Sequence, residues 1–337
     1  MARVKTKHEG WATMLAIREE AAVKKIVVAG EILVEIMAET VGDGFPGPIA
    51  LTGPYPSGAP AIFIDQVARL GQPCGIISMV GQDDFGRLNV DRLAADGVDV
   101  SAIGIDPDRP TGSAFVRYRA DGSRDFVFNI RHSACGSLPR SPAVDALLNS
   151  AGHLHVMGSS LSSREIIDFN IEAARAIKAK GGTVSFDPNL RKEILAAPGM
   201  APAMLTILAL TDLFLPSGEE ITLLTTAKDE AGAVAELLQR GIRAIVHKQG
   251  ARGVSYHDAS GRRFVPAFTV QEVDPTGAGD CFGGAFTALW LRNETIDRAL
   301  TLAAAAGALA VTKRGPMEGA ATLDTLISFV AQQRRPL

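Results

Sequence analysis

The segment from Asp274 to Phe286, Asp-Pro-Thr-Gly-Ala-Gly-Asp-Cys-Phe-Gly-Gly-Ala-Phe, constrains this chain more than any other. Pro275 ends the extended backbone before it, because the residue preceding a proline avoids the helical region. Gly277 and Gly279 permit tight or positive-φ conformations and the close approach of a ligand. Apolar residues at helical spacing follow: Phe282, Ala285, Phe286, Leu289 and Trp290. The sequence therefore predicts a glycine loop at a helix start, whose N–H groups and dipole attract an anion.

Asp280 stands inside this predicted anion site, where its negative charge would repel a bound phosphate. Two roles account for a carboxylate here. Asp is a preferred N-cap residue, and it would then only begin the helix. Alternatively, Asp280 is a general base that takes a proton from a substrate hydroxyl, while the loop N–H groups stabilise charge on a transferring phosphoryl group. The spacing alone favours neither role.

The order Asp-x-x-Gly-Ala-Gly-Asp resembles the C-terminal signature of the ribokinase-like (PfkB) sugar kinases. This resemblance implies that Asp280 is the catalytic base. It also implies that the backbone of Gly277, Ala278 and Gly279 forms the anion hole for the γ-phosphate of ATP. The resemblance runs from about Lys25 to the C-terminus. It implies a ribokinase-like three-layer α/β fold, with a mainly parallel central sheet flanked by helices and a small β-sheet lid.

Composition and charge argue against several other classes of protein. The chain has 337 residues, 47% hydrophobic and 21% charged, as in an ordinary globular protein with one large domain. Its net charge of −3 provides no general attraction to nucleic acid or anionic membranes. No apolar run approaches the ~20 residues of a spanning helix, and no secretory signal is recognisable. Because Cys74, Cys135 and Cys281 show no paired spacing, we expect neither a disulfide nor a zinc site. This cysteine usage favours a cytoplasmic protein.

From Lys25 onward, strand patterns alternate with helix patterns, which indicates parallel strands joined by helical crossovers. We therefore expect one kinase domain over residues 25–337. Residues 1–24 are expected to be a tail that matches no catalytic pattern.

Residues 111–129 interrupt this alternation with two extended runs around the turn Ala-Asp-Gly-Ser, which predicts a β-hairpin. Extended segments outside the main alternation are expected at 32–37, 49–52, 114–119 and 124–129. Together they predict a small sheet, from about 31–56 and 110–132, that acts as a lid over the active site. As in some relatives, this lid sheet is expected to pair with a second copy in a homodimer.

The sugar side of the site follows from the resemblance, with two departures from the family pattern. Ser57-Gly58-Ala59-Pro60-Ala61 resembles the family's Gly-Gly-x-x-x-Asn segment, but the Asn position is Ile62, which has no hydrogen-bonding side chain. The family's strand-end Asp is Glu35, which still offers a carboxylate to sugar hydroxyls. The resemblance implies that Glu35, Ser57 and Gly58 bind the substrate.

The segment Asp187-Pro-Asn189-Leu-Arg191 is predicted at a strand end, where open parallel sheets bind ligands. In the ketose and keto-sugar kinases that the chain resembles, the corresponding Asn and Arg lie close to the substrate and the transferred phosphate. Substrate-binding roles for Asn189 and Arg191 are therefore implied, and an Arg suits phosphate because it presents planar charged donors. The alternative is a loop Asn and a surface Arg.

The nucleotide side also follows from the resemblance. Pro216-Ser-Gly-Glu-Glu220 corresponds to the family's Asn-x-x-Glu, with Ser217 in the Asn position. It implies that Glu220 holds water around Mg2+. Lys248-Gln-Gly250-Ala-Arg-Gly253 matches the turn that borders the nucleotide, so Lys248, Gly250 and Gly253 are expected to contact ATP, together with Ser217 and the anion loop.

Four further residues have two interpretations each. Asp274 is either a turn-forming residue before Pro275 or, as in relatives that bind a monovalent cation beside this loop, a ligand of K+. His153 and His155 alternate on a strand, and packing is favoured over metal binding because no third ligand is nearby. Cys281 either has a lowered pKa at the helix start or packs in the core, and packing is favoured.

The substrate is indicated by resemblance alone. Segments 31–35, 57–66 and 315–319 look similar to those of tagatose kinases, which implies phosphorylation of D-tagatose at its C6 hydroxyl. The alternative is a 2-keto-3-deoxygluconate kinase. Those enzymes place a carboxylate-binding Arg where this chain has Ile130, and Arg131, one residue away, would point elsewhere in an extended segment. Fructokinase is a third choice.

A function of another class is a non-catalytic sugar sensor on the same fold, because Ile62, Ser217 and Ala304 replace Asn residues of the family pattern. The intact Asp280 and its anion loop argue against it, since a sensor needs no base in an anion hole. A nicotinamide oxidoreductase is disfavoured, because no Gly-x-Gly-x-x-Gly follows the first strand.

Overall fold

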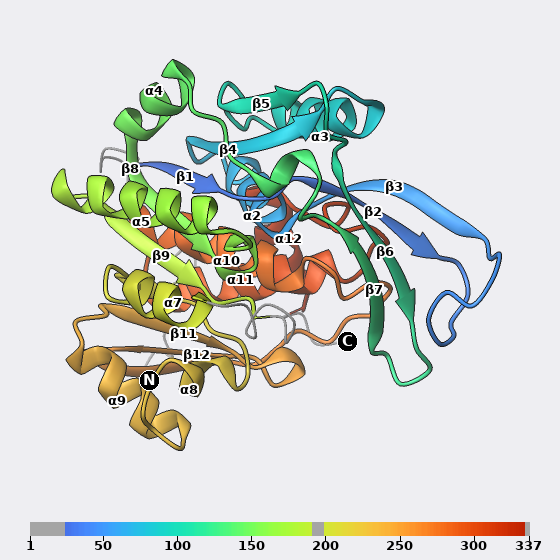
Figure 1. The fold of residues 1–337 in the computed structure, drawn as a ribbon. Helices are drawn as coiled ribbons and strands as arrows, with labels where there is room; N and C mark the ends of the chain where they lie inside the picture. Colours follow the sequence, from blue (N-terminus) through green and yellow to red (C-terminus); the bar gives the residue numbers. More distant parts are fainter. Residues whose placement is uncertain (1–23, 191–198, 334–337) are drawn as a thin grey trace.

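The computed structural model describes residues 24–190 and 199–333. Within these ranges nine strands form a central sheet (Figure 1). Their order across the sheet is β13 (Gly261–Val265), β12 (Val254–Asp258), β11 (Ala244–Lys248), β10 (Leu213–Phe214), β9 (Thr183–Asp187), β8 (Ala151–Met157), β1 (Lys25–Ala29), β4 (Cys74–Gly81) and β5 (Ile103–Asp106). The pairs from β11 to β5 are parallel, and β12 and β13 add an antiparallel edge.

Helices cover both faces of this sheet, as the strand and helix alternation predicts (Figure 1). One group comprises α2 (Ala59–Arg69), α3 (Asp84–Ala95), α10 (Ala278–Leu291), α11 (Ile296–Ala310) and α12 (Leu323–Gln333). The other comprises α4 (Pro142–Ser150), α5 (Arg164–Ala179), α7 (Met200–Leu208), α8 (Glu220–Leu223) and α9 (Glu230–Gln239). Successive side chains of a strand enter opposite cores. In β1, Ile26 and Val28 pack with the first group, whereas Val27 and Ala29 pack with the second.

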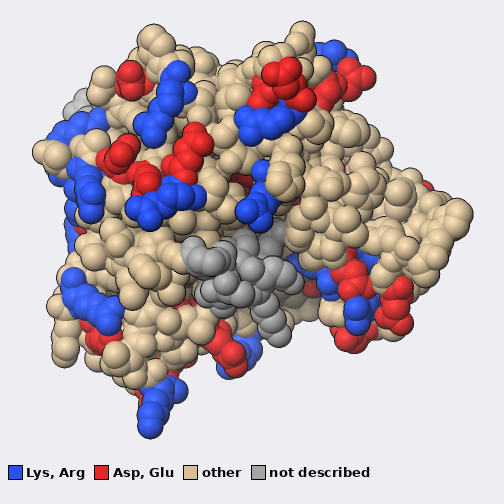
Figure 2. Space-filling view, viewed as in Figure 1, with Lys and Arg blue, Asp and Glu red and all other residues tan. Residues whose placement is uncertain are grey.

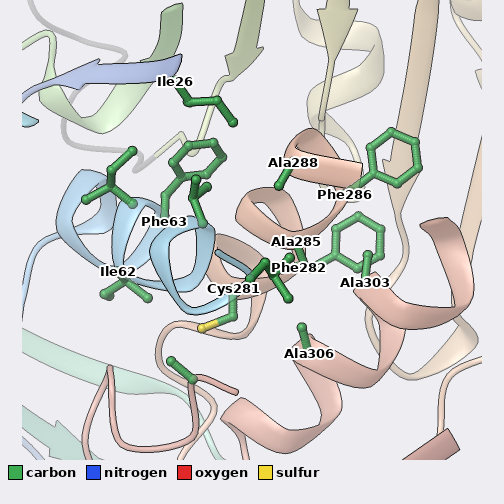
Figure 3. Close-up of a cluster of buried hydrophobic side chains, with 14 of the residues drawn as sticks. Ile26, Ile62, Phe63, Cys281, Phe282, Ala285, Phe286, Ala288, Ala303 and Ala306 are labelled. Carbon is green, nitrogen blue, oxygen red and sulfur yellow. The ribbon is translucent and has the colours of Figure 1, made fainter. Parts of the chain in front are cut away.

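In the first core, α2 packs against α10 and α11 (Figure 3). Phe63 of α2 and Phe286 of α10 are fully buried there, and Ala303 of α11 closes the cluster. Small residues on α10 let α2 approach closely, because a Cβ at Gly284 would lie 2.5 Å from the carbonyl oxygen of Phe63. This packing fixes the start of α10 against the sheet.

A second, smaller sheet confirms the four predicted extended segments. Its order is β3 (Leu51–Ser57), β2 (Leu33–Ala38), β6 (Gly112–Tyr118) and β7 (Arg124–Asn129), and it extends to one side of the central sheet (Figure 1). The β2–β6 pair is parallel and the others are antiparallel. Strand β3 extends further than the expected segment 49–52 and ends at Ser57, although it contains Pro54 and Pro56. An edge strand tolerates proline, since one side of its backbone needs no ladder partner.

Several elements lack a clear sequence signal and were not predicted, namely α4, α7, β5, β12 and β13. Strand β13 shows the reason, because four of its five residues are exposed, so no alternation of buried and exposed positions marks it. Conversely, the extended backbone expected just before Pro275, residues 268–273, belongs to no strand.

Two surface properties bear on partners. Within residues 24–190 and 199–333, no helix is both long and apolar enough to cross a membrane. On the face seen in Figure 2, basic and acidic side chains lie interspersed.

Candidate functional site

A cavity of about 970 Å3 lies where the carboxyl ends of the central strands face the small sheet. Open parallel sheets bind ligands at this edge. The cavity brings together most of the residues that the sequence nominated: Glu35, Ser57, Gly58, Asn189, Ser217, Lys248, Gly277, Gly279 and Asp280. It therefore joins segments that lie more than 200 residues apart in the chain.

The glycine loop begins helix α10 as predicted. Gly277 is the N-cap, with φ 82°, and a Cβ there would lie 2.4 Å from the carbonyl oxygen of Pro316. The N–H of Cys281 donates to the Gly277 carbonyl at 2.8 Å as the first turn closes. The N–H groups of Ala278, Gly279 and Asp280 precede this bond, so helix geometry directs them out of the helix end. Because Gly277 is the cap, the interpretation of Asp280 as the N-cap is wrong.

Asp280 is the third residue of α10 and half-buried at the cavity wall. The side-chain amide of Asn189 donates to its Oδ1 at 3.3 Å. Asn189 reaches it from the loop after β9 in a left-handed conformation, φ 40°, which Asn tolerates better than most residues. The side chain of Asn189 therefore lines the cavity and contacts Asp280.

Lys248 lies at the end of β11, where its Nζ donates to Oδ2 of Asp187, at the end of β9. Burial alone would lower the pKa of Lys248, but the carboxylates of Asp187, Glu220 and Asp280 outweigh it and raise this pKa. The ammonium group is thus held charged next to the anion loop, since a Cβ at Gly279 would lie 3.7 Å from Nζ. Asp187 was missed, because its role depends on Lys248, which reaches it from another strand.

The carboxylate of Glu220 binds backbone N–H groups of two loops and is not among the residues that line the cavity. Its Oε1 accepts the N–H of Leu190 at 2.7 Å, and its Oε2 accepts the N–H of Ser217 at 2.6 Å. Burial raises the pKa of Glu220, and the charge of Asp187 adds to this. A carboxylate has about four acceptor positions, so two remain for water. In the described part of the chain no three His, Cys, Asp or Glu residues are grouped to hold a metal ion.

Two buried carboxylates line the opposite side of the cavity. Glu35 on β2 is 5% exposed, and the hydroxyl of Ser57 donates to its Oε1 at 2.8 Å. Glu31, in the connection from β1 to β2, accepts hydrogen bonds from the hydroxyls of Ser159 and Ser160. Glu31 was missed, although it lies only two residues after the end of β1.

The rest of the wall on this side is mixed, with Ser123, Arg124 and Asp125 from the β6–β7 hairpin next to an apolar part. Ile62 lines the cavity, as do Phe126 and Phe128 of β7, whose rings stack with centroids 4.9 Å apart. The position at which the family pattern has Asn therefore offers only van der Waals contact in this chain.

Some nominated residues lie away from the cavity wall. Gly250 and Gly253, with φ 58° and 115°, form the turn between β11 and β12 and are not among the lining residues. Asp274 is 1% exposed and accepts three hydrogen bonds within the protein. Arg191 lies outside the described residues. Arg131 lines two other cavities, one of them together with Ile130.

The buried histidines and Cys281 are packing residues. His153 is hydrogen-bonded to Thr183 and Ser185, and burial lowers its pKa to about 3. His155 stacks on Phe63 with ring centroids 3.6 Å apart. Cys281 of α10 is fully buried in the core that α10 forms with α2 (Figure 3), and burial raises its pKa, so the packing prediction is confirmed.

Comparisons with known proteins agree with this geometry. The sequence profile of the pfkB family carbohydrate kinases matches residues 23–323. A 2-dehydro-3-deoxygluconokinase of Thermoproteus tenax is 33% identical over 88% of this chain and 91% of its own length. A fructokinase of Vibrio alginolyticus is 31% identical over 82% and 92%. An E. coli protein provisionally named ribokinase II, solved in complex with ATP and Mg2+, is 49% identical with a TM-score of 0.87, over 92% of this chain and 99% of its own.

Proposed function

The chain belongs to the pfkB family of carbohydrate kinases, and from that premise we propose that it transfers the γ-phosphate of ATP to the C6 hydroxyl of a ketohexose, with D-tagatose as the first choice. The observation that carries the proposal is the position of Asp280. Its carboxylate shares one cavity with the N–H groups of a helix start and with the buried carboxylates of the opposite wall. A hydroxyl, a base and an anion site can therefore meet there.

In this mechanism Asp280 accepts the proton of the attacking sugar hydroxyl, an effect worth ~10²- to 10⁴-fold in rate. Asn189 donates to the Oδ1 atom of Asp280 and so orients the carboxylate. The N–H groups at the start of α10 donate to the transferring phosphoryl group, each contributing about 10²- to 10³-fold. Lys248 adds a fixed positive charge beside them.

Glu220 fits a hydrated Mg2+, because its oxygens retain acceptor positions for water after binding two backbone N–H groups. Bound Mg2+ would neutralise charge on the phosphate oxygens. Since Ser217 replaces the family's Asn, only its backbone N–H, held by Glu220, supports this side.

A ketohexose suits the sugar side better than a keto acid. Glu31 and Glu35 both line the cavity, and their negative charges would repel a substrate carboxylate while accepting hydrogen bonds from sugar hydroxyls. Arg131, the cation nearest to the position used by 2-keto-3-deoxygluconate kinases, lines other cavities. D-tagatose itself rests on the resemblance of segments that include both glutamates.

We also propose that the small sheet, about 31–56 and 110–132, acts as a lid that excludes water from the active site. The lid sheet pairs with a second copy in a homodimer, and the kinase domain is cytoplasmic. Sedimentation that shows a monomer at all working concentrations would refute the dimer.

We further propose that K+ binds near Asp274. This binding would appear as a K+-dependent rate, whereas equal rates in Na+ and K+ would exclude it.

The test is an ADP-release assay with Mg-ATP against tagatose, fructose, other ketohexoses, aldohexoses, ribose, nucleosides and 2-keto-3-deoxygluconate. We expect the highest kcat/KM with tagatose. Preference for the keto acid would instead favour the function named for the Thermoproteus tenax relative. Tight binding of one sugar with no ADP release would favour the non-catalytic sensor.

A further inference from the structure

Two residues of the small sheet contact the segment just before the anion loop, Asp274 and Thr276. The hydroxyl of Tyr118, at the end of β6, donates to Oδ1 of Asp274 at 2.6 Å. The guanidinium of Arg124, at the start of β7, donates to the hydroxyl of Thr276 at 2.9 Å. Tyr118 and Arg124 are register partners across the hairpin, so they point to the same face of the sheet. One end of this hairpin therefore contacts this segment through two adjacent side chains.

Asp274 connects this contact to the anion loop. Besides Tyr118, its carboxylate accepts the N–H of Thr276 at 3.0 Å and the N–H of Gly315 at 3.0 Å. The carboxylate is 1% exposed, so each of these donors replaces water that it has lost. The backbone just before Gly277 is thus tied to the same carboxylate that holds the small sheet. A shift of Tyr118 would be felt at the helix start three residues along the chain.

The same face of the small sheet carries the sugar side of the cavity. Alternate residues of a strand share a face, so Ala114 lies on the Tyr118 face of β6. Ala114 is the register partner of Glu35 on β2 and of Phe128 on β7. Glu35 and Phe128 both line the cavity. A sugar bound against this face therefore contacts the sheet whose far end holds the anion loop.

We propose that Tyr118 is a positioning residue, which acts through Asp274 to hold the Gly277–Gly279 loop in its transfer geometry while the small sheet covers the bound sugar. This inference rests on the proposed kinase function and adds a residue to it. Tyr118 does not itself line the cavity and does not reach the reacting atoms, so its effect is on the rate of transfer and on the exclusion of water. When the contact is lost, ATP is more readily attacked by water, giving ADP and inorganic phosphate.

The test compares the wild-type protein with Tyr118→Phe, which removes only the hydroxyl. We expect kcat to fall about tenfold, because a buried carboxylate loses one donor and the loop loses its anchor. The KM for the sugar is expected to change by less than about twofold. ADP formed per sugar phosphate formed is expected to rise above one. A further variant, Tyr118→Phe with Asp274→Asn, should be no slower than Asp274→Asn alone, because both changes remove one pathway.

A matched control is Tyr256→Phe, because Tyr256 also donates from a largely buried ring to a carboxylate, Asp258, at 2.8 Å, on β12 away from the cavity. It should keep the wild-type kcat and stoichiometry. An equal fall of kcat in both variants would mean a general loss of stability and would overturn the proposal. So would an unchanged kcat in Tyr118→Phe, or additive losses in the double variant. A wild-type protein that phosphorylates no sugar refutes the proposed function itself, and this inference with it.

Discussion

The two halves of the cavity are built in different ways. The half that we propose to bind phosphate, here called the phosphate half, is mostly backbone, the N–H groups of one contiguous loop at the start of α10, with Lys248 and Asn189 brought beside it. The half that we propose to bind the sugar, here called the sugar half, consists of side chains on a separate sheet and on the connection before it, with Glu31, Glu35 and Phe128 among them. The first half follows from local helix geometry. The second depends on how one sheet is placed against another.

This difference predicts how substitutions separate. Changes in the phosphate half should reduce the rate of transfer to every sugar, because every reaction uses the same loop and base. Changes in the side chains that line the sugar half should alter which sugar binds, and at what concentration, with a smaller effect on kcat. A substitution in the phosphate half that changed only the sugar KM, or a substitution of a lining residue in the sugar half that changed only kcat, would contradict this distinction.

The largest effect is expected from Asp280→Asn. The amide keeps the shape and the contact with Asn189, but it cannot accept the hydroxyl proton, so kcat should fall by ~10²- to 10⁴-fold. Binding of ATP and sugar, measured by calorimetry, should be largely retained. Near-normal turnover of the Asp280→Asn variant would contradict the assignment of Asp280 as the base.

The next largest effect is expected from Gly277→Ala. Its φ of 82° and the carbonyl of Pro316, 2.4 Å from the added Cβ, both force the loop to shift, so kcat should fall about 10²-fold with all sugars. Gly199→Ala is the matched control, because Gly199 is also an N-cap, with φ 85°, but its Cβ would meet no atom within 4 Å. It should lose about 1 kcal/mol of stability and keep its kcat. Equal kcat losses in the two variants would contradict this account of the loop.

The smallest effect is expected from Glu35→Gln. The amide replaces one acceptor by a donor at the position that Ser57 orients, so the KM for the sugar should rise about tenfold. The KM for ATP and the kcat should change little. Glu39→Gln, just beyond the end of β2 and exposed, is the control and should behave as wild type. A fall of kcat without a change in the sugar KM would place Glu35 in the phosphate half instead.

More of the phosphate half than of the sugar half could be predicted from the sequence. The glycine loop, the helix after it and Asp280 lie in one segment, and the structure places them as expected except for the cap, which is Gly277. Asp187 and Glu31 were missed, because each is a single carboxylate at a strand end, and such a residue gains a role only from what packs opposite. Likewise, β12 and β13 carry little apolar pattern, so their place at the sheet edge could not be predicted.

The sequence by itself determined the alternation of strands and helices and the anion loop, because both depend on residues within a few positions of one another. Only the tertiary structure decided which distant groups meet: Asn189 with Asp280, Lys248 with Asp187, and Tyr118 with Asp274 across 156 positions. Such contacts depend on the order of strands in two sheets and on the packing of α2 against α10. Neither leaves a local pattern in the chain, since any partner of suitable chemistry would satisfy a single hydrogen bond.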